Sequence, residues 1–186
     1  MDKEKLRIKL LKKRKKQKKH IVLEKSKKIG ERLFSTDDFK KASKILFYVS
    51  YDNEVFTHDM IKKCLSENKK MIVPIVDKEK NKLVLSELVS WGHLEKGAYN
   101  ILEPKKKFII ETSIDKIDLI IVPGVGFDLK GNRIGHGKGF YDKLLKISKA
   151  KKIGLAFEWQ VFDEIPTDNY DIPINMIISE SRIIKC

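Results

Sequence analysis

The spacing of hydrophobic residues changes near Phe34. Before this residue, apolar positions recur every three or four residues, which is the rhythm of amphipathic helices. Two such series precede the change, the first at Leu6, Leu10 and Leu11 and the second at Val22, Ser26, Ile29 and Leu33. We therefore predict two helices within residues 1–33.

After Phe34, short apolar runs alternate with stretches of helical spacing. Five runs predict strands buried on both faces, at residues 44–50, 71–76, 118–123, 152–157 and 176–180. Residues 56–68 and 138–148 predict helices, with Thr57 or Asp59 as a cap of the first and Gly137 or Gly139 at the start of the second. Residues 82–88 predict an extra strand, and residues 103–113 a surface loop with a short extended piece.

The alternation of strands and helices predicts an α/β fold. A mostly parallel sheet with helices on both faces, a Rossmann-like arrangement of three layers, accommodates this order of elements. No internal repeat or low-complexity linker marks a boundary, so we predict a single domain over residues 1–186. The basic helices of residues 1–33 are expected to pack on its α/β body.

Positive charge is concentrated at the start of the chain. The net charge is +14, and residues 1–33 hold 15 Lys and Arg against 4 Asp and Glu, whereas residues 34–186 hold 25 against 22. Clustered lysines can neutralise the phosphates of a nucleic acid, so a nucleic-acid-binding module is one hypothesis. The run lacks interleaved aromatic residues and matches no known module, and two helices with solvated basic faces explain it without any nucleic acid.

Other features limit the class of protein. No window approaches the roughly eighteen apolar residues of a membrane span, and the lysine-rich start lacks the apolar core of a signal peptide. We expect a soluble, cytoplasmic monomer that needs no membrane. Cys64 and Cys186 have no metal-ligand spacing, and we assign neither as a metal ligand, disulfide partner or nucleophile.

The stretch RIGHGKGFYD, residues 133–142, carries the clearest chemical pattern. Glycines let the backbone approach an anion, the amides at the start of the following helix add donors, and Arg133 and Lys138 add full charges. The stretch follows the strand at 118–123, and ligands of parallel sheets gather beyond the carboxyl ends of strands. Neither the P-loop pattern nor the G-x-G-x-x-G fingerprint is matched. We predict a phosphate site of another type, suited to a triphosphate.

A family resemblance rests on four segments in order along the chain. Residues 123–142, PGVGFDLKGNRIGHGKGFYD, resemble the signature of the 5-formyltetrahydrofolate cyclo-ligase family, also called 5,10-methenyltetrahydrofolate synthetase. The other similar segments are KEKLR (3–7), SYDNEVFT (50–57) and IPTDNYDIPINMII (165–178). Within the signature, His136 stands where the family commonly has arginine, and Phe140 where it commonly has the first of two tyrosines.

The resemblance implies a ligase that closes 5-formyltetrahydrofolate to 5,10-methenyltetrahydrofolate with ATP and Mg²⁺, releasing ADP and phosphate. It implies phosphoryl transfer to the N5-formyl oxygen, followed by attack of N10, with Lys138 and Arg133 as the catalytic charges. The implied ATP contacts are Lys3, Arg7, Arg133, Ile134, Gly135, His136, Gly137, Lys138, Gly139, Phe140 and Tyr141. The implied folate contacts are Glu54, Tyr99, His136, Phe140 and Tyr141, and the implied Mg²⁺ ligands are Asp142 and Asp171.

Two alternatives stay open at this point. Phe140 could equally be a packing residue, because phenylalanine is so often buried. An enzyme that uses ATP or a sugar phosphate on the same scaffold, with another substrate, would also fit the glycine loop.

Overall fold

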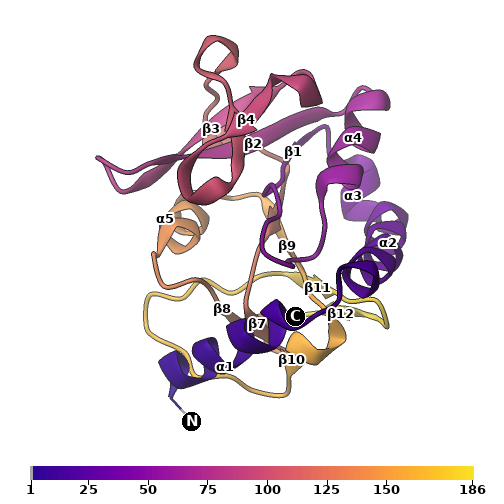
Figure 1. Ribbon diagram of the computed structural model, residues 1–186, viewed down its shortest axis with the longest axis vertical. Helices are drawn as coiled ribbons and strands as arrows, with labels where there is room; N and C mark the ends of the chain where they lie inside the picture. Colours follow the sequence, from indigo (N-terminus) through magenta and orange to yellow (C-terminus); the bar gives the residue numbers. More distant parts are fainter. Residues whose placement is uncertain (1) are drawn as a thin grey trace.

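The structure, a computed structural model, describes residues 2–186 and is built around a seven-stranded sheet (Figure 1). The strands lie in the order β12-β11-β9-β6-β1-β2-β3. Their bounds are β1 Lys44–Leu46, β2 Lys70–Asp77, β3 Lys82–Leu88, β6 Leu119–Val122, β9 Lys151–Leu155, β11 Met176–Ile178 and β12 Ile183–Lys185. The five inner strands are parallel, and β3 and β12 pair antiparallel at the two edges. The predicted mostly parallel sheet is confirmed.

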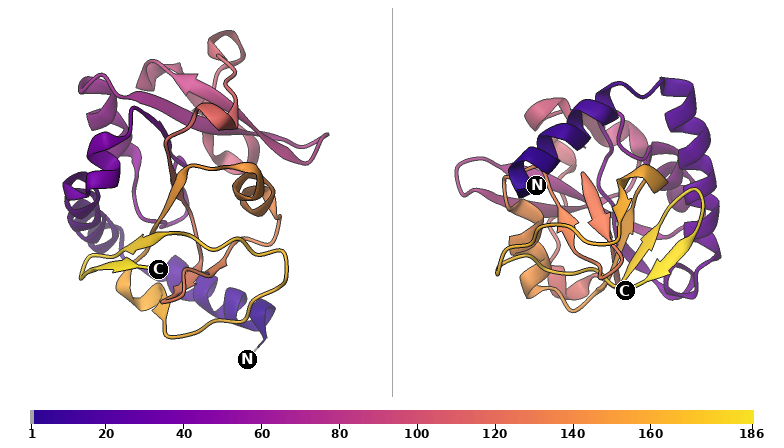
Figure 2. Two further views of the ribbon diagram at one scale, coloured as in Figure 1. Left: turned by 180° about the vertical axis from the view of Figure 1, so that it is seen from behind. Right: turned by 90° about the horizontal axis from the view of Figure 1, so that it is seen from below.

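Helices cover both faces of this sheet (Figures 1 and 2). One face carries α2 (Lys19–Ser35), α3 (Asp37–Lys41) and α4 (His58–Ser66), and the other carries α5 (Phe140–Ile147). Ile29, Leu33 and Ile61 are fully buried against the first face, and Leu144 and Leu145 pack on the second. These apolar stripes produce the three layers that the sequence pattern predicted.

Helix α1 (Lys3–Lys15) lies below the sheet in the view of Figure 1. Leu6 and Leu10 on its apolar face form a small core with Val125, Ile134 and Ile165. This core adjoins a three-stranded sheet that the sequence did not reveal, made of β10 (Val161–Phe162), β7 (Gly126–Asp128) and β8 (Arg133–Ile134). The outward lysines of α1 are exposed, as expected for a solvated basic face.

Some boundaries differ from the prediction. The strand expected at 44–50 leaves the sheet after Leu46, and only the backbone nitrogen of Phe47 still bonds to Ile72, at 2.9 Å. Thr57 does precede α4, but its hydroxyl donates to the Tyr48 carbonyl at 2.8 Å and makes no cap bond to the helix. The segment after β1 is therefore folded on itself rather than extended.

The region between β3 and β6 is irregular, and the surface loop predicted at residues 103–113 lies within it. It contains the hairpin of β4 (Leu94–Lys96) and β5 (Leu102–Pro104) and an isolated bridge between Ser86 and Glu111. Short 3-10 turns lie at Trp91–His93, Ala98–Asn100, Lys106–Phe108, Ile114–Lys116 and, later in the chain, Glu158–Gln160. None of the helices within residues 2–186 has the length and apolar composition needed to cross a membrane.

Candidate active site

A cavity of about 430 Å³ opens beyond the carboxyl ends of β1 and β6. From β1 the chain adds β2 on one side, and it later adds β6 on the other side of β1. This reversal of strand order is the place where parallel sheets bind ligands. The cavity gathers most of the predicted site residues: Lys3, Arg7, Glu54, Tyr99, Arg133, Gly135, His136, Gly137, Lys138, Gly139, Phe140, Tyr141, Asp142 and Asp171. Ile134 is the exception, because its side chain is fully buried against α1.

The glycine loop, residues 135–139, forms one wall and leads directly into α5. Gly137 and Gly139 have φ values of 89° and 67°, which residues with a side chain adopt only with strain. At Gly135, a Cβ would come within 2.7 Å of Arg133 Nη1. The three glycines are therefore needed for backbone conformation and for the packing of Arg133. Gly139 is also the residue before the first turn of α5, whose free amides are suited to bind an anion.

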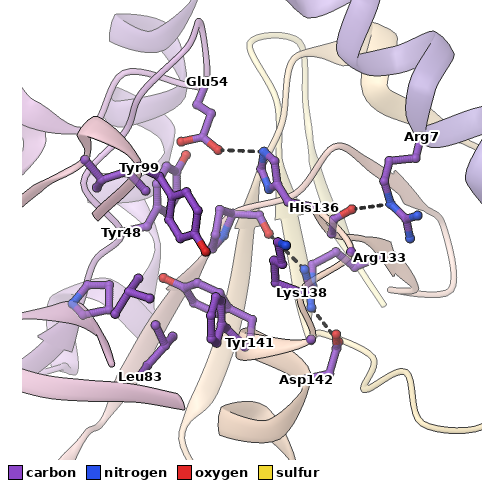
Figure 3. Close-up of a pocket in the computed structure, with 18 of the residues that line it drawn as sticks. Arg7, Tyr48, Glu54, Leu83, Tyr99, Arg133, His136, Lys138, Tyr141 and Asp142 are labelled. Carbon is purple, nitrogen blue, oxygen red and sulfur yellow. Dashed lines mark hydrogen bonds and ion pairs between the residues drawn. The ribbon is translucent and has the colours of Figure 1, made fainter. Parts of the chain in front are cut away.

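Four cations converge at this end of the cavity. Arg7 Nε donates to the Gly135 carbonyl at 2.8 Å, which anchors helix α1 to the loop. Arg133 is almost completely buried, and its Nη2 donates to Asp142 Oδ1 at 2.6 Å (Figure 3). Lys3 Nζ lies 2.8 Å from Asp168 and 2.5 Å from Asp171. Lys138 is exposed at the cavity and forms no ion pair within residues 2–186, so its charge is free to meet an anion.

The two carboxylates predicted as Mg²⁺ ligands are thus each paired with a predicted phosphate-binding cation. Asp142 holds Arg133, and Asp171 holds Lys3. Within the described part of the chain, no group of three or more His, Cys, Asp or Glu side chains is placed to enclose a metal ion. Two carboxylates suit Mg²⁺ that keeps waters and phosphate oxygens as its other ligands, rather than a cage made by protein alone.

Glu54 lies at the other end of the cavity, in the loop after β1. Its Oε2 accepts from the Tyr51 backbone nitrogen at 3.1 Å, and its Oε1 lies 3.6 Å from His136 Nε2 (Figure 3). Burial raises the pKa of Glu54 to about 7, although the Arg14 guanidinium opposes this shift. Burial, with Arg14 and Arg133 nearby, lowers the pKa of His136 to about 4. His136 is therefore neutral at neutral pH, and Glu54 changes its charge close to that pH.

Aromatic and apolar side chains surround this second end. Tyr141 is oriented toward the cavity, and its hydroxyl has no hydrogen-bond partner within residues 2–186 (Figure 3). Burial raises the pKa of this hydroxyl, so it remains a donor. Tyr99 is half-exposed at the mouth, and Phe140 is partly buried at the cavity wall. The remaining wall is formed by Val49, Pro74, Val76, Leu83 and Ile101. A flat, largely apolar ring system with polar edges fits these surroundings.

Several residues at the site were missed by sequence reasoning. Tyr48, Tyr51, Asp168 and Tyr170 line the cavity, and Arg14 contacts Glu54 directly. One signal for Arg14 was available. It lies four residues after Leu10, on the apolar face of the predicted helix, where a charged side chain needs a buried partner.

Comparison with known proteins identifies the family of this chain. The model of the 5-formyltetrahydrofolate cyclo-ligase family matches residues 1–180. The 5-formyltetrahydrofolate cyclo-ligase of Haemophilus influenzae is 30% identical over 139 residues, which cover 73% of this chain and 74% of that protein. The enzyme of the same name from Mus musculus is 29% identical over 163 residues, covering 82% and 80%.

Two solved structures are also similar. The 5,10-methenyltetrahydrofolate synthetase of Aquifex aeolicus superposes with a TM-score of 0.89 at 36% identity, over 100% of this chain and 93% of that one. The Mycoplasma pneumoniae structure, with a TM-score of 0.77 at 23% identity over 97% and 99%, shares the fold. The family model covers the glycine loop, the Glu54 loop and the segment with Asp171, and all three meet at one cavity. This chain belongs to the 5-formyltetrahydrofolate cyclo-ligase family and is a ligase.

Proposed function

We propose that this chain uses ATP to close 5-formyltetrahydrofolate to 5,10-methenyltetrahydrofolate, releasing ADP and phosphate. One observation carries the proposal: a single cavity joins a cation-rich glycine loop to a buried carboxylate among aromatic side chains. The first end suits a triphosphate and the second suits a folate, so the two substrates would meet inside one enclosure.

The reaction requires activation of the N5-formyl carbon, which is a weak electrophile. The N5-formyl group is an amide, and its oxygen is a poor leaving group until it is phosphorylated. The γ-phosphoryl group would leave ADP and bond to the formyl oxygen while the N5 lone pair forms a C=N bond. N10 would then bond to the formyl carbon and lose its proton, and the C–O bond would break to release phosphate. The product keeps the single carbon between N5 and N10.

The protein would contribute positioning and charge to these steps, rather than a covalent intermediate. Lys138 and Arg133 would stabilise the transferred phosphoryl group, and Lys3, Arg7 and the loop amides would hold the rest of the triphosphate. Glu54, with the hydroxyl of Tyr141, would orient the polar edge of the folate. Tyr99 at the mouth and Phe140 at the wall would contact the flat rings.

The carboxylates of this chain fit Mg²⁺ that arrives with the nucleotide. Asp142 and Asp171 would hold it, and Mg²⁺ would supply neutralisation of phosphate charge when bound. In the structure these two groups already occupy positions next to Arg133 and Lys3, the cations that would contact phosphate. Cations and carboxylates would therefore exchange their present partners for phosphates and metal.

The test is growth of the methenyl-folate absorbance band on mixing the protein with 5-formyltetrahydrofolate, Mg²⁺ and ATP, against a control without ATP. Lys138→Ala should lower turnover at least about tenfold, since it removes a group that stabilises transferred charge. Lys146→Ala is the matched control, because Lys146 is an exposed lysine on α5 away from the cavity.

Each result has a distinct meaning. A band that grows only with ATP supports the proposal, and equal loss in both lysine variants would remove the role given to Lys138. Absence of the band in a protein that binds ATP would refute the folate reaction. An ATP-dependent enzyme with another substrate would then be the leading hypothesis.

A further inference from the structure

Arg14 is the most completely buried lysine or arginine within residues 2–186, with 1% of its surface exposed, although it lies in the last turn of a surface helix. A buried guanidinium persists only when its charge is paired. Its Nη1 lies 3.3 Å from Glu54 Oε1, and its Nη2 lies 3.6 Å from Asp52 Oδ2 and 3.1 Å from His136 Nε2. Arg14 therefore touches two side chains at the folate end of the cavity.

The contact with His136 determines which ring nitrogen carries the proton. A guanidinium only donates hydrogen bonds, so His136 Nε2 must accept and the ring proton must be on Nδ1. Nε2 is then unable to donate to Glu54, 3.6 Å away, so Glu54 depends on Arg14 and the Tyr51 amide for its donors. One arginine thus orients both the carboxylate and the imidazole.

The backbone of the same turn holds the loop that carries Glu54. Asn53 Nδ2 donates to the carbonyl oxygens of Arg14, at 3.3 Å, and of Gln17, at 3.0 Å. Asp52 and Asn53 have φ values of 44° and 57°, in the left-handed region that Asp and Asn adopt more readily than most residues, and they turn the loop toward α1. These bonds satisfy carbonyls at the end of α1 and fix the loop at the same time.

The other end of α1 lies at the phosphate site. One face of α1 carries three basic residues, Lys3, Arg7 and Arg14, because they are separated by four and by seven positions. Arg7 donates a hydrogen bond to the Gly135 carbonyl, and Arg14 donates one to the adjacent His136. The helix therefore also holds the glycine loop in place. The rise of a helix separates Arg7 from Arg14 by about 10 Å along this face.

We propose that Arg14 is a positioning residue that orients Glu54 and His136 toward the folate, and that α1 thereby contributes to both substrate sites. This role rests on the proposed cyclo-ligase function. Arg14 acts through the two side chains that it holds, and it does not line the cavity itself. A polar folate edge would meet an oriented carboxylate acceptor at Glu54.

The charge surroundings of Glu54 make this role measurable. Six side chains from four parts of the fold surround this carboxylate. They are Tyr48, Tyr51 and Asp52 from the segment after β1, His136 from the glycine loop, Tyr141 from α5, and Arg14 from α1. Among these, Arg14 is the nearest permanent cation, and its loss would raise the pKa of Glu54 above the present value of about 7. The acidic limb of the pH profile would move to higher pH.

The experiment compares Arg14→Met with Lys15→Met, a control at an exposed lysine of the same turn. Steady-state rates are measured for folate and for ATP separately, across pH. Arg14→Met should lower kcat/KM for the folate by about tenfold, because it removes hydrogen bonds to a charged group. The KM for ATP should change much less, the acidic limb should shift upward, and Arg14→Lys should recover part of both effects.

A double-mutant cycle separates positioning from general damage. In a Glu54→Gln background, Arg14→Met should cause far less additional loss than in the wild type, because the two residues act as a unit. Additive losses, or an Arg14→Met enzyme that matches Lys15→Met, would overturn the role of Arg14. If the wild type itself forms no methenyl product with ATP, the proposed function fails, and this outcome is distinct from the others.

A second variant tests the proposal even if Arg14→Met does not fold. Asn53→Gly removes the amide that ties the loop to α1, and glycine tolerates the backbone conformation at this position. It leaves the buried charges in place, so the folate KM should rise several-fold while the acidic limb stays where it is. An unchanged folate KM in a folded Asn53→Gly protein would overturn the proposal.

Discussion

The Arg133–Asp142 ion pair offers a prediction in which stability and metal dependence can be measured on the same variant. The Arg133 side chain is 4% exposed, and Asp142 is 23% exposed, with 2.6 Å between Nη2 and Oδ1. Asp142→Asn keeps the shape of the side chain and removes its charge, which leaves a buried guanidinium without its counterion. Hydrogen bonds to charged groups contribute about 1.5–3 kcal/mol, so we expect a loss of about 2 kcal/mol in the free energy of unfolding. For a chain of this length, this loss lowers Tm by about 4–8 °C.

The functional effect of the same change has two parts. Arg133 would become free to bind phosphate, whereas a carboxylate proposed to hold Mg²⁺ would be lost. We therefore expect the Mg²⁺ concentration at half-maximal rate to rise about tenfold, as for the loss of one charge-assisted contact. ATP binding measured without Mg²⁺ should be unchanged or tighter, because a negative charge next to the phosphates has been removed.

The assay titrates Mg²⁺ at saturating ATP and follows formation of the methenyl product, while a thermal melt reports stability. Asp163→Asn is the matched control, since Asp163 is exposed and has no ion pair within residues 2–186. A Mg²⁺ titration identical to that of the wild type would exclude Asp142 as a ligand. A Tm equal to that of Asp163→Asn would show that the ion pair adds nothing to stability and would refute the energetic reasoning.

Three further predictions concern the loop and the folate end. Gly137→Ala should raise the KM for ATP several-fold, because an alanine at φ 89° is strained; Gly92→Ala, whose Cβ would meet only Ser90 at 3.8 Å, should leave that KM unchanged. Tyr141→Phe should leave Tm unchanged, since the hydroxyl has no partner within residues 2–186, and should lower kcat/KM for the folate by about five- to tenfold; a lowered Tm with unchanged kinetics would contradict this. For pH, the Glu54 carboxyl holds its proton up to about pH 7 in the folded chain but only to about 4.5 when unfolded, so its contribution to stability is full below pH 4.5 and declines toward pH 7. His136 acts in the opposite sense, because its folded pKa of about 4 lies below the unfolded 6.5, so its contribution is full above 6.5 and declines toward pH 4. Melts of Glu54→Gln and wild type across this range isolate the first effect: the Tm of the variant relative to wild type should rise between pH 4.5 and 7, and a constant difference would contradict the assigned pKa.

Local patterns predicted most of the architecture. Each of the five inner strands lies within or close to a continuous apolar run, because a strand buried on both faces needs apolar residues at every position. The glycine loop could also be located from local sequence, because the glycines that allow its backbone conformation lie close together along the chain. Strand ends were less predictable. Residues 47–49 are as apolar as a strand requires. The Thr57 hydroxyl nevertheless donates a hydrogen bond to the Tyr48 carbonyl, and this segment leaves the sheet.

The cluster of Arg14, Glu54 and His136 could not be predicted from any local pattern. Its members lie in three segments that are far apart in the sequence, and only tertiary packing decides that an arginine at the end of α1 meets a glutamate after β1. The same applies to the ion pair between Lys3 and Asp171, which joins the two ends of the chain. The resemblance to the family located Lys3, Glu54, His136 and Asp171 as site residues, but it gave no indication that they would pair in this way.

These ion pairs bear on how the two substrates would enter. In the structure Lys3 and Arg133 are neutralised by Asp171 and Asp142, and Lys138 alone among the proposed phosphate-binding Lys and Arg side chains has neither an ion pair nor a hydrogen bond within residues 2–186. A triphosphate without metal would bring its charge next to both carboxylates, and like charges in a partly buried cavity repel strongly. On the proposed function, Mg²⁺ bound to ATP resolves this conflict, because each carboxylate gains a cation as it gives up its own. Each cation and each carboxylate would keep an oppositely charged partner in this exchange, and the charge balance of the cavity thus favours the metal–nucleotide complex over either component alone.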